Sequence, residues 1–443
     1  MRIAYICADL GIPVSGNKGA SVHIREFTDA LVELGHEVHI YSASRESHLT
    51  RVSSQNLTRA ILTILAPSAE IQAAAKLVAA SLLRLDRLRD PAHLRSEILH
   101  FIADPAFVTA ALPHLRDFAP DLLITRHALF SIAGLELAHL LGCPCVLEVN
   151  APLIEERRRY WGLTLEQEAE QAERMAFADA DLLVAVSTGV RDYMLRYGAS
   201  PDRVMVLPNG VNPARFHPNV DGSAVRRRYG LEGKIVVGFA GSLKPWHGVD
   251  LLLHAFASVY AAIMSEGGQE GRAPHLLIIG DGPQRKALLQ LSHALGVSTA
   301  VTFTGPLPYS EMPAYLAALD IAVAPYRSSN TFYFSPLKLM EYMAMGRAIV
   351  APMLGQIPAL LQGADDPCGL LYHPDNHQEL GAMLWHLIND QNMRQILGMR
   401  AAEQARQHHS WQTIAQTIIK CVDSLAPGVP YQDDADRKGI VHS

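Results

Sequence analysis

RIAYICADLGIPVSGNKGASVHIREFTDALVELGHEVHIY, residues 2–41, is the stretch that decides the fold class. Its first six residues form a short apolar run of the strand type, and a loop rich in glycine and proline follows. Residues 22–34 carry apolar side chains at helical spacing, Gly35 ends that helix, and residues 37–41 form a second strand. A strand, a loop, a helix and a strand in this order predict a parallel, doubly wound sheet.

The same alternation continues along the chain and then starts again. Further strands of a first domain are predicted at 122–125, 145–149, 182–186 and 204–207. A strand at 234–240, a loop at 241–248 and a helix at 249–260 repeat the opening unit, and later strands are predicted at 275–279, 301–304, 321–325 and 348–351. Because 443 residues exceed what one core usually supports, we predict two α/β domains.

The domain boundaries follow from these patterns. Residues 1–210 are assigned to the first domain and residues 211–407 to the second. A helix at about 408–426 follows and is assigned back to the first domain. The polar, charged tail at 427–443 is expected to be disordered.

An insertion at about 56–118 interrupts the alternation of the first domain. It is expected to be almost entirely helical, with four prolines that separate its helices: Pro67, Pro91, Pro105 and Pro113. Its stretch 76–95 mixes leucine and alanine with four arginines: Arg84, Arg87, Arg89 and Arg95. A helical insertion packed on the sheet, with a solvated basic face, is favoured over a helix at a membrane surface.

Composition excludes several classes of protein. The formal charge of −6 argues against a nucleic-acid binder. Five cysteines without a C-x-x-C pair argue against a disulfide framework or structural zinc. The first ten residues lack the features of a signal peptide, and no run of 18 uncharged apolar residues predicts a spanning helix. We therefore expect a cytoplasmic protein, with weak peripheral contact at the inner membrane face left open.

The loops that follow strands are where open α/β sheets bind ligands. The first, at 16–21, offers Lys18 and Gly19 ahead of a helix whose free N–H groups suit an anion. It does not have the G-x-G-x-x-G spacing, and no acidic residue follows the second strand to hold a ribose. Further loops of this kind carry Ser242, Lys244 and His247, and then Gly280.

The segment 335–341 is the most informative of these loops. Ser335 and Pro336 are typical of a helix N-cap and first position, so the N–H groups of Leu337 and Lys338 are predicted to face an anion. Glu341 lies one turn further along, where a carboxylate suits ribose hydroxyls. This pattern indicates a nucleoside diphosphate site; the alternative is a capped helix with a Lys–Glu pair.

Several stretches together resemble the GT-B-fold, retaining glycosyltransferases of family four (glycosyl transferases group 1). They are KGASVHIREFTDALVELGHEV (18–38), NGVN (209–212), GFAGSLKPWHGVDLLL (238–253), GDGP (280–283), ALDIAVAPY (318–326) and SPLKLMEYMAMGRAIVA (335–351). The resemblance implies two Rossmann-like domains that face a central cleft. It also implies transfer of a sugar from a nucleotide-diphosphate donor, without a metal or a further cofactor.

The resemblance also assigns donor-side roles. Lys18 and Gly19 approach the donor phosphates or the acceptor, and Leu307 sits where backbone groups meet the base. In many members an arginine and a lysine clamp the diphosphate; those positions are Ser242 and His247 here, and Lys244 is the substitute. Tyr333 stands where many members have a glutamate that contacts the sugar. The donor set is therefore Lys18, Gly19, Ser242, Lys244, His247, Gly280, Leu307, Tyr333, Ser335, Pro336, Leu337, Lys338 and Glu341.

On the acceptor side the resemblance and the strand ends indicate five residues: His23, Arg126, His127, Glu148 and Asn150. Asn150 stands where many relatives have a histidine near the reacting carbon, and an amide cannot shuttle a proton at neutral pH. His127 is either a polar acceptor-site residue or a loop cap. Lys338, Lys244, Asn150 and His127 are the predicted catalytic residues.

The predicted function is a glycosyltransferase that joins a nucleotide sugar to an acceptor. The acceptor stays open among a glycan, a lipid-linked saccharide, a sugar phosphate and a small natural product. One alternative keeps the fold but makes it an epimerase or phosphorylase. The other is a sugar-nucleotide-binding protein without turnover, which the departures at Ser242, Tyr333 and Asn150 motivate. The Asp-x-Asp triplets at 179–181 and 434–436 are interpreted as solvated carboxylates rather than metal ligands.

Overall fold

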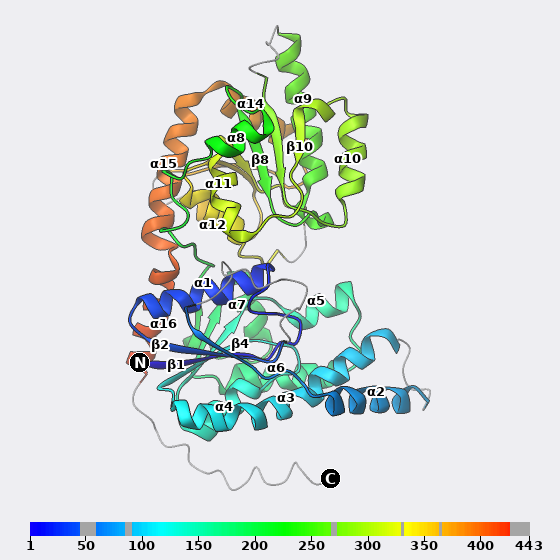
Figure 1. The fold of residues 1–443 in the computed structure, drawn as a ribbon, viewed down its shortest axis with the longest axis vertical. Helices are drawn as coiled ribbons and strands as arrows, with labels where there is room; N and C mark the ends of the chain where they lie inside the picture. The colour runs from blue at the N-terminus through cyan, green and yellow to red at the C-terminus, as the bar shows by residue number, and fades with distance from the viewer. Residues whose placement is uncertain (45–58, 85–90, 267–272, 329–331, 363–365, 426–443) are drawn as a thin grey trace.

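The computed structural model describes residues 1–44, 59–84, 91–266, 273–328, 332–362 and 366–425. It consists of two α/β halves stacked along the long axis of the molecule (Figure 1). The expected tail at 427–443, the triplet at 434–436 and the basic residues Arg87 and Arg89 lie outside the described residues.

The first half is built on a seven-stranded parallel sheet of order β3-β2-β1-β4-β5-β6-β7. Its strands are β1 (Arg2–Cys7), β2 (Glu37–Ser42), β3 (Ile61–Ile64), β4 (Leu122–Arg126), β5 (Cys145–Val149), β6 (Leu182–Ala185) and β7 (Val204–Val206). Its helices are α1 (Gly19–Glu33), α2 (Ala69–Arg84), α3 (Pro91–Phe118), α4 (Ala133–Leu141), α5 (Leu153–Tyr160), α6 (Glu166–Asp179), α7 (Thr188–Arg196) and α16 (Trp411–Ser424).

The second half repeats this plan with a six-stranded parallel sheet of order β10-β9-β8-β11-β12-β13. Its strands are β8 (Val236–Ala240), β9 (His275–Ile279), β10 (Val301–Phe303), β11 (Ile321–Val323), β12 (Ala348–Pro352) and β13 (Leu370–Tyr372). Its helices are α8 (Ser223–Tyr229), α9 (Val249–Ser265), α10 (Arg285–Ala294), α11 (Met312–Ala317), α12 (Leu337–Ala344), α13 (Ile357–Gln362), α14 (His377–Asn389) and α15 (Gln391–His408). The predicted fold class, two doubly wound parallel sheets, is confirmed.

The strand orders fix where a ligand can lie. In each sheet the chain order reverses at one point, between β1 and β4 and between β8 and β11. Open α/β sheets bind ligands beyond the carboxyl ends of the strands at such a point. The two carboxyl edges face each other here: a Cβ added to Gly19 of α1 would lie 3.7 Å from Leu337 of α12.

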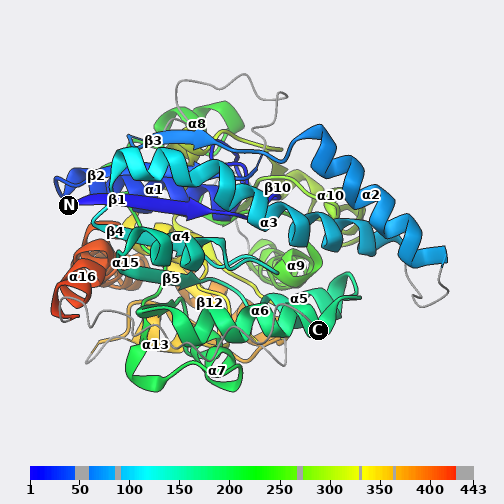
Figure 2. The ribbon, with the colours of Figure 1, turned by 90° about the horizontal axis from the view of Figure 1, so that it is seen from below.

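The insertion, expected to be almost entirely helical, also contains a strand. Residues 61–64 form strand β3, which extends the sheet beside β2. Pro105 and Pro113 do not end a helix but lie inside α3. In Figure 2, α2 and α3 reach past the end of the sheet, and α3 packs on α2 and α4. Tertiary packing therefore overrides the helix-breaking tendency of the two prolines.

Part of α3, His93–Phe118, is long and apolar enough to cross a membrane by length and composition alone. In the fold, this helix carries buried carboxylates that bond to neighbouring loops. Asp104 accepts from the Ser131 hydroxyl at 2.5 Å and from the Ile132 N–H at 3.0 Å. These bonds attach α3 to the loop after β4, at the carboxyl edge of the sheet.

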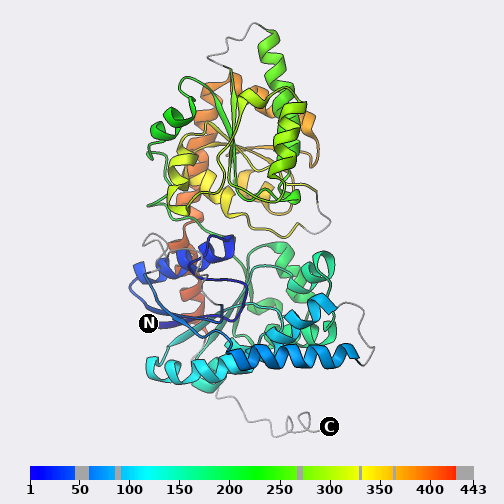
Figure 3. The same cartoon turned by 45° about the vertical axis from the view of Figure 1, so that its right-hand side comes forward.

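The chain returns to the first half at its end. α15 and α16 run in succession along both halves (Figures 1 and 3). Trp411, Ile414 and Ile418 of α16 belong to the same apolar core as Phe27 of α1. At the crossing, Val211 donates its N–H to His409 O at 2.8 Å and accepts from Trp411 N at 3.0 Å.

Candidate donor and acceptor site

Lys338 places a cation at the start of α12. The residue is half-buried, but its Nζ has no exposed surface and no hydrogen-bond partner among the described residues. Nζ lies 4.1 Å from the ring centroid of Phe239 and 5.2 Å from that of Tyr326. Burial lowers the pKa of this amine to about 7, against the raising effect of Glu341. An anion beside Nζ would supply the partner that the described part of the chain does not.

Gly241, at the end of β8, leaves the space that the Lys338 amine occupies. A Cβ at this position would lie 2.7 Å from Nζ, and the φ angle of +141° is itself unfavourable for other residues. A Cβ on Gly280 would lie 2.2 Å from the carbonyl oxygen of Gly241. Glycine at both strand ends therefore lets the backbone of two loops close around the start of α12.

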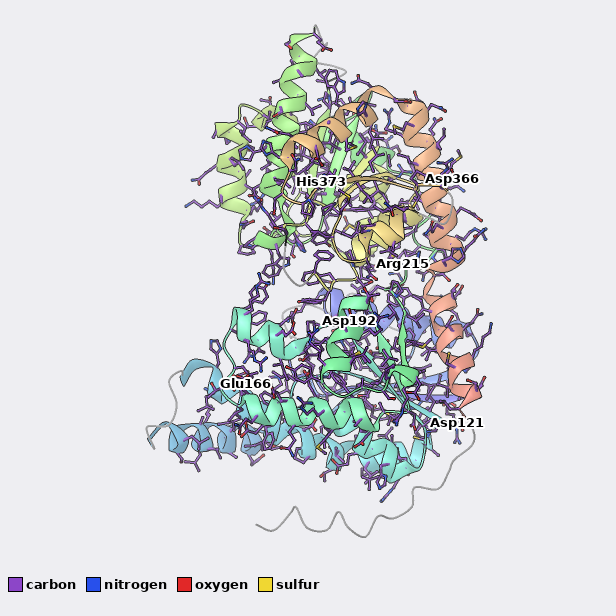
Figure 4. All side chains as sticks on the ribbon, turned by 180° about the vertical axis from the view of Figure 1, so that it is seen from behind. Asp121, Glu166, Asp192, Arg215, Asp366 and His373 are labelled. Atoms are coloured by element: carbon purple, nitrogen blue, oxygen red, sulfur yellow. The ribbon has the colours of Figure 1, made fainter. Side chains whose placement is uncertain are left out.

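Glu341 lies one turn beyond Lys338 and is 7% exposed. Its Oε1 accepts the hydroxyl of Tyr309 at 3.0 Å. Burial raises the pKa of Glu341 to about 7, and the neighbouring Glu26 acts in the same direction. Arg215, which binds Glu26 at 2.6 Å, lies where the two halves meet (Figure 4). A cation and a carboxylate one turn apart thus line the edge of the second sheet.

Ser335 does not cap α12, contrary to the sequence-based expectation. The N-cap is Pro336, and it makes no side-chain capping bond. Ser335 Oγ instead accepts the backbone N–H of Asn209 at 2.8 Å, and its carbonyl accepts Asn209 Nδ2 at 2.6 Å. The serine therefore ties the approach to α12 to the segment that links the halves. The N–H groups at the start of α12 are left without a side-chain cap.

A buried chain of hydrogen bonds continues from Asn209 into the first half. Asn209 Oδ1 lies 2.8 Å from His23 Nδ1, and His23 Nε2 lies 3.2 Å from Glu148 Oε1. Tyr5 donates to the other Glu148 oxygen at 2.5 Å. Burial raises the pKa of Glu148, but His23, Arg126 and Tyr5 outweigh burial and lower it overall. The polar atoms of His23 and Glu148 are engaged inside the protein, which favours a positioning role; acceptor contact by either stays a prediction.

The loop after β8 holds the residues at the family's clamp positions. His247 Nδ1 contacts the carbonyl of Ser242, and burial lowers the pKa of His247 to about 3, aided by Lys338 and Lys244. A neutral imidazole supplies no positive charge to a diphosphate. Lys244 Nζ lies 4.8 Å from the Trp246 ring centroid. Lys338 and Lys244 are thus the cationic side chains on the donor side of the described site.

Two other predicted donor residues contact their own half of the protein. Lys18 is the N-cap residue of α1, and its Nζ donates to the Gly11 carbonyl at 2.8 Å, so it is folded onto its own loop. Leu307 packs against the apolar core of the second half. Their contacts with a donor stay predictions.

Tyr333 bridges the halves. Its hydroxyl donates to Glu156 Oε1 of α5, and its carbonyl accepts the Ser187 hydroxyl at 2.7 Å. Burial raises the pKa of Glu156, while Tyr333 and Lys244 lower it. Where many relatives have a glutamate, this chain has a tyrosine paired with a glutamate from the other half. A carboxylate is therefore present beside Tyr333, but it comes from α5.

The remaining predicted acceptor residues lie at or just after the ends of β4 and β5. Arg126 Nη1 and Asn150 Nδ2 are buried donors without a hydrogen-bond partner among the described residues. The His127 side chain is 2% exposed, makes no loop-capping bond within the described ranges and lies 3.4 Å from Glu173 of α6. Burial lowers the pKa of His127 to about 3 and raises that of Glu173 to about 8, so both are uncharged at neutral pH. His127 thus packs against α6, while Arg126 and Asn150 keep unused donors.

Sequence reasoning missed several residues of the site. Tyr309 and Tyr326 shape the surroundings of Glu341 and Lys338, and Glu156 pairs with Tyr333. Tyr326 is the last residue of ALDIAVAPY (318–326), one of the stretches that carry the family resemblance. Tyr309 and Glu156 carry no local pattern, because their roles depend on contacts between residues far apart in the chain.

Comparison with known proteins agrees with this geometry. Residues 17–215 match the family model described as Glycosyltransferase Family 4, and residues 234–390 match the model described as Glycosyl transferases group 1. The chain is 26% identical over 441 residues to the MMP alpha-(1->4)-mannosyltransferase of Mycolicibacterium hassiacum, which covers 92% of this chain and 95% of that protein.

Two further similarities cover different shares of the chain. The D-inositol 3-phosphate glycosyltransferase of Nocardia farcinica is 30% identical over 258 residues, 57% of this chain and 54% of that protein. The solved structure of HepE from Anabaena in complex with UDP superposes with a TM-score of 0.68 at 19% identity. This superposition covers 96% of this chain and 100% of HepE, and it shows the shared fold.

The fold and the matched models define a glycosyltransferase with the GT-B fold. The two family models between them cover most of both halves, and along both of them the chain resembles the family 4 glycosyltransferases.

Proposed function

We infer that the protein transfers a sugar from a nucleoside diphosphate to an acceptor hydroxyl, with retention of configuration and without a resident metal or cofactor. The observation that carries the donor assignment is Lys338 Nζ, a buried amine at the start of α12 that has no hydrogen-bond partner among the residues described. A diphosphate placed there would meet this amine and the free N–H groups of the helix. Glu341, one turn on, accepts hydroxyl donors such as those of a ribose.

The same groups also stabilise the leaving diphosphate during sugar transfer. Breaking the bond between sugar and diphosphate leaves negative charge on the leaving phosphate. Fixed donors aimed at that position stabilise the transition state by several kcal/mol. We assign this role to Lys338 and the N–H groups of α12, with Lys244 nearby. HepE, of the same fold, is described in complex with UDP, so a UDP-sugar is the first donor to test. The proposed location is the cytoplasm, with weak peripheral contact at the inner membrane face left open.

Calorimetric titration with UDP tests the donor site. Lys338→Gln and Glu341→Gln should each weaken binding at least about tenfold, which corresponds to about 1.4 kcal/mol. Lys286→Gln, on the exposed face of α10, is the matched control and should bind as the wild type does. Unchanged affinity in both site variants would contradict the assignment.

Incubation with a UDP-sugar alone separates transfer from the alternatives with the same fold. An epimerase would convert the donor without any acceptor. A binding protein would retain UDP affinity and yield no product with any acceptor. A transferase yields a glycoside whose anomeric configuration, read by NMR, matches that of the donor if the reaction is retaining.

A further inference from the structure

The first half contains a pocket of about 230 Å³ that none of the predicted acceptor residues lines. It is formed by the loops after β1 and β4, by α3, and by α5 with the residue that follows it. Its polar lining consists of Asp9, Glu97, His100, Glu156 and Arg157, and Trp161 lies beside them. We refer to it as the α3–α5 pocket. Because the loops after β1 and β4 flank the reversal point of the sheet, the pocket lies where such folds bind ligands.

One carboxylate of the pocket holds its wall in place. Glu97, on α3, is 1% exposed, and its Oε2 accepts the N–H groups of Thr164 and Leu165 at 3.0 and 2.9 Å. Its Oε1 lies 3.7 Å from Nη2 of Arg157. Glu97 thus fixes both the loop after α5 and the guanidinium that lines the pocket. The insertion thereby becomes part of the pocket.

The other two carboxylates have acceptor capacity to spare. Asp9 accepts the Gly11 N–H at 2.7 Å, and Glu156 accepts the Tyr333 hydroxyl. An ionised carboxylate offers about four lone-pair sites and donates nothing, so it favours ligands with hydroxyl groups. Arg157 Nε is a buried donor without a partner in the described part of the chain, so it suits a ligand oxygen.

The charge of the lining disfavours an anionic ligand. Three of its residues are acidic, and its guanidinium already faces Glu97. Asp9 and Glu156 would repel a phosphate group, whereas they attract hydroxyl protons. The apolar part of the wall is Leu129, Phe130 and Leu153, and the Trp161 side chain is 46% exposed beside them. A ligand with both C–H faces and hydroxyls fits such a wall.

We propose that the α3–α5 pocket binds the acceptor as an uncharged polyhydroxylated ring, a sugar or cyclitol, with one face on Trp161 and its hydroxyls donated to Asp9 and Glu156. This inference rests on the proposed function, since it names the acceptor of that same reaction. Glu156 connects the two sites: Tyr333, which donates to it, precedes the start of α12 by four residues. The departure at Tyr333 therefore places a carboxylate where acceptor and donor meet.

Saturation-transfer NMR on the full chain with saturating UDP tests the pocket. The uncharged probes are methyl α-glucoside, methyl α-mannoside and myo-inositol, and each is compared with a phosphate monoester of the same ring. At least one uncharged probe should bind about tenfold or more tightly than its phosphorylated counterpart. Equal or tighter binding of the phosphorylated probes would overturn the inference, as would absence of binding by all three uncharged probes.

Two variants localise the binding. Trp161→Ala should weaken the uncharged probe about tenfold or more, whereas Phe101→Ala should leave it unchanged. Phe101 is the matched control because it is 51% exposed on α3 and does not line the pocket. Glu156→Gln can still accept from Tyr333 but has lost its charge, so it should reduce the discrimination against phosphate. Probe affinity that is the same in Trp161→Ala and Phe101→Ala, or discrimination that is unchanged in Glu156→Gln, would place the acceptor elsewhere.

UDP titration of the same samples distinguishes failure of the proposed function from failure of the acceptor assignment. Failure of the wild type to bind UDP or any other nucleoside diphosphate would reject the proposed function itself. Normal UDP binding with failed probe selectivity would reject only the acceptor assignment.

Discussion

Lys338 carries a basic amine in a buried position, and burial disfavours the charged form of that amine. Its Nζ is enclosed by Phe239 and Tyr326, and burial lowers its pKa to about 7, against about 10.4 in an unfolded chain. The folded state therefore binds fewer protons between these two values, and this residue reduces stability most at or below pH 7. A loss of folding stability of this kind is typical of groups that serve ligand binding.

Lys338→Met should therefore stabilise the protein while it weakens UDP binding. The gain in the free energy of unfolding should be about 0.5–2 kcal/mol at pH 7 and should shrink as the pH rises towards 10. Urea unfolding at pH 7 and pH 9 measures it, and calorimetry measures UDP affinity in the same samples. A loss of stability at pH 7 would show that the amine has a partner in the unliganded protein.

UDP binding should also take up a proton at pH 8. Free Lys338 is mostly neutral there, whereas a bound diphosphate favours the ammonium form; Glu341, with a pKa raised to about 7 by burial, is already ionised. About one proton per UDP is expected from the lowered pKa. Calorimetry in two buffers with different ionisation enthalpies detects it, and Lys338→Gln should abolish it. Equal binding enthalpies in the two buffers for the wild type would contradict this account.

At the scale of elements, α12 is held by a chain of hydrogen bonds rather than by a cap. Asn209 connects Ser335 to His23 and so connects the approach to α12 with the core of the first half. Removing Asn209 leaves buried polar groups unpaired at both ends.

Asn209→Ala should therefore destabilise the protein by about 1–3 kcal/mol and weaken UDP binding, although Asn209 is not assigned to the donor set. Urea unfolding and UDP titration measure the two effects. His293→Ala, an exposed residue of α10, is the control and should change neither. Loss of stability with unaltered UDP affinity would show that the chain does not position α12.

The sequence predicted elements better than it predicted contacts. α12 and its neighbours were found because helix and strand periodicity is local, and the loops after strands followed from topology. Strand β3 was missed because four residues at a sheet edge, with Ile61 56% exposed and Ile64 42% exposed, form too short a pattern within a helical region. The cap at Ser335 was wrong because Asn209, distant in sequence, binds that hydroxyl. Glu156 could not be found, since its partner Tyr333 lies in the other half.

At the scale of the whole molecule, the halves are joined on one side by the chain and on the other by side chains. Helices α15 and α16 lie on one side of the molecule in Figure 1, and α5 lies on the other. On the α5 side, Tyr333 donates to Glu156, and Tyr160 packs 5.9 Å from Trp246 between ring centroids. Opening of the molecule should therefore begin at α5.

Tyr333→Phe should shift the unliganded protein towards a more open arrangement. Its hydrogen bond to a carboxylate contributes about 1.5–3 kcal/mol, enough to change the balance between closed and open populations. Small-angle scattering should report a larger radius of gyration than the wild type, and UDP should reverse the difference. Tyr260→Phe, on α9 away from the contact, serves as the control. An unchanged radius without ligand would show that the tyrosine does not hold the halves together.

The double passage of the chain beside Val211 has a consequence for how this protein can be divided. The second half begins and ends at the same place, where Val211 bonds to His409 and Trp411. In the order of the chain, the second half is therefore an insertion within the first half. Residues 211–409 could be excised or exchanged with both cut points adjacent. A fragment that stops at residue 210 would leave the apolar face of α1 uncovered, because α16 supplies its cover from the far end of the chain.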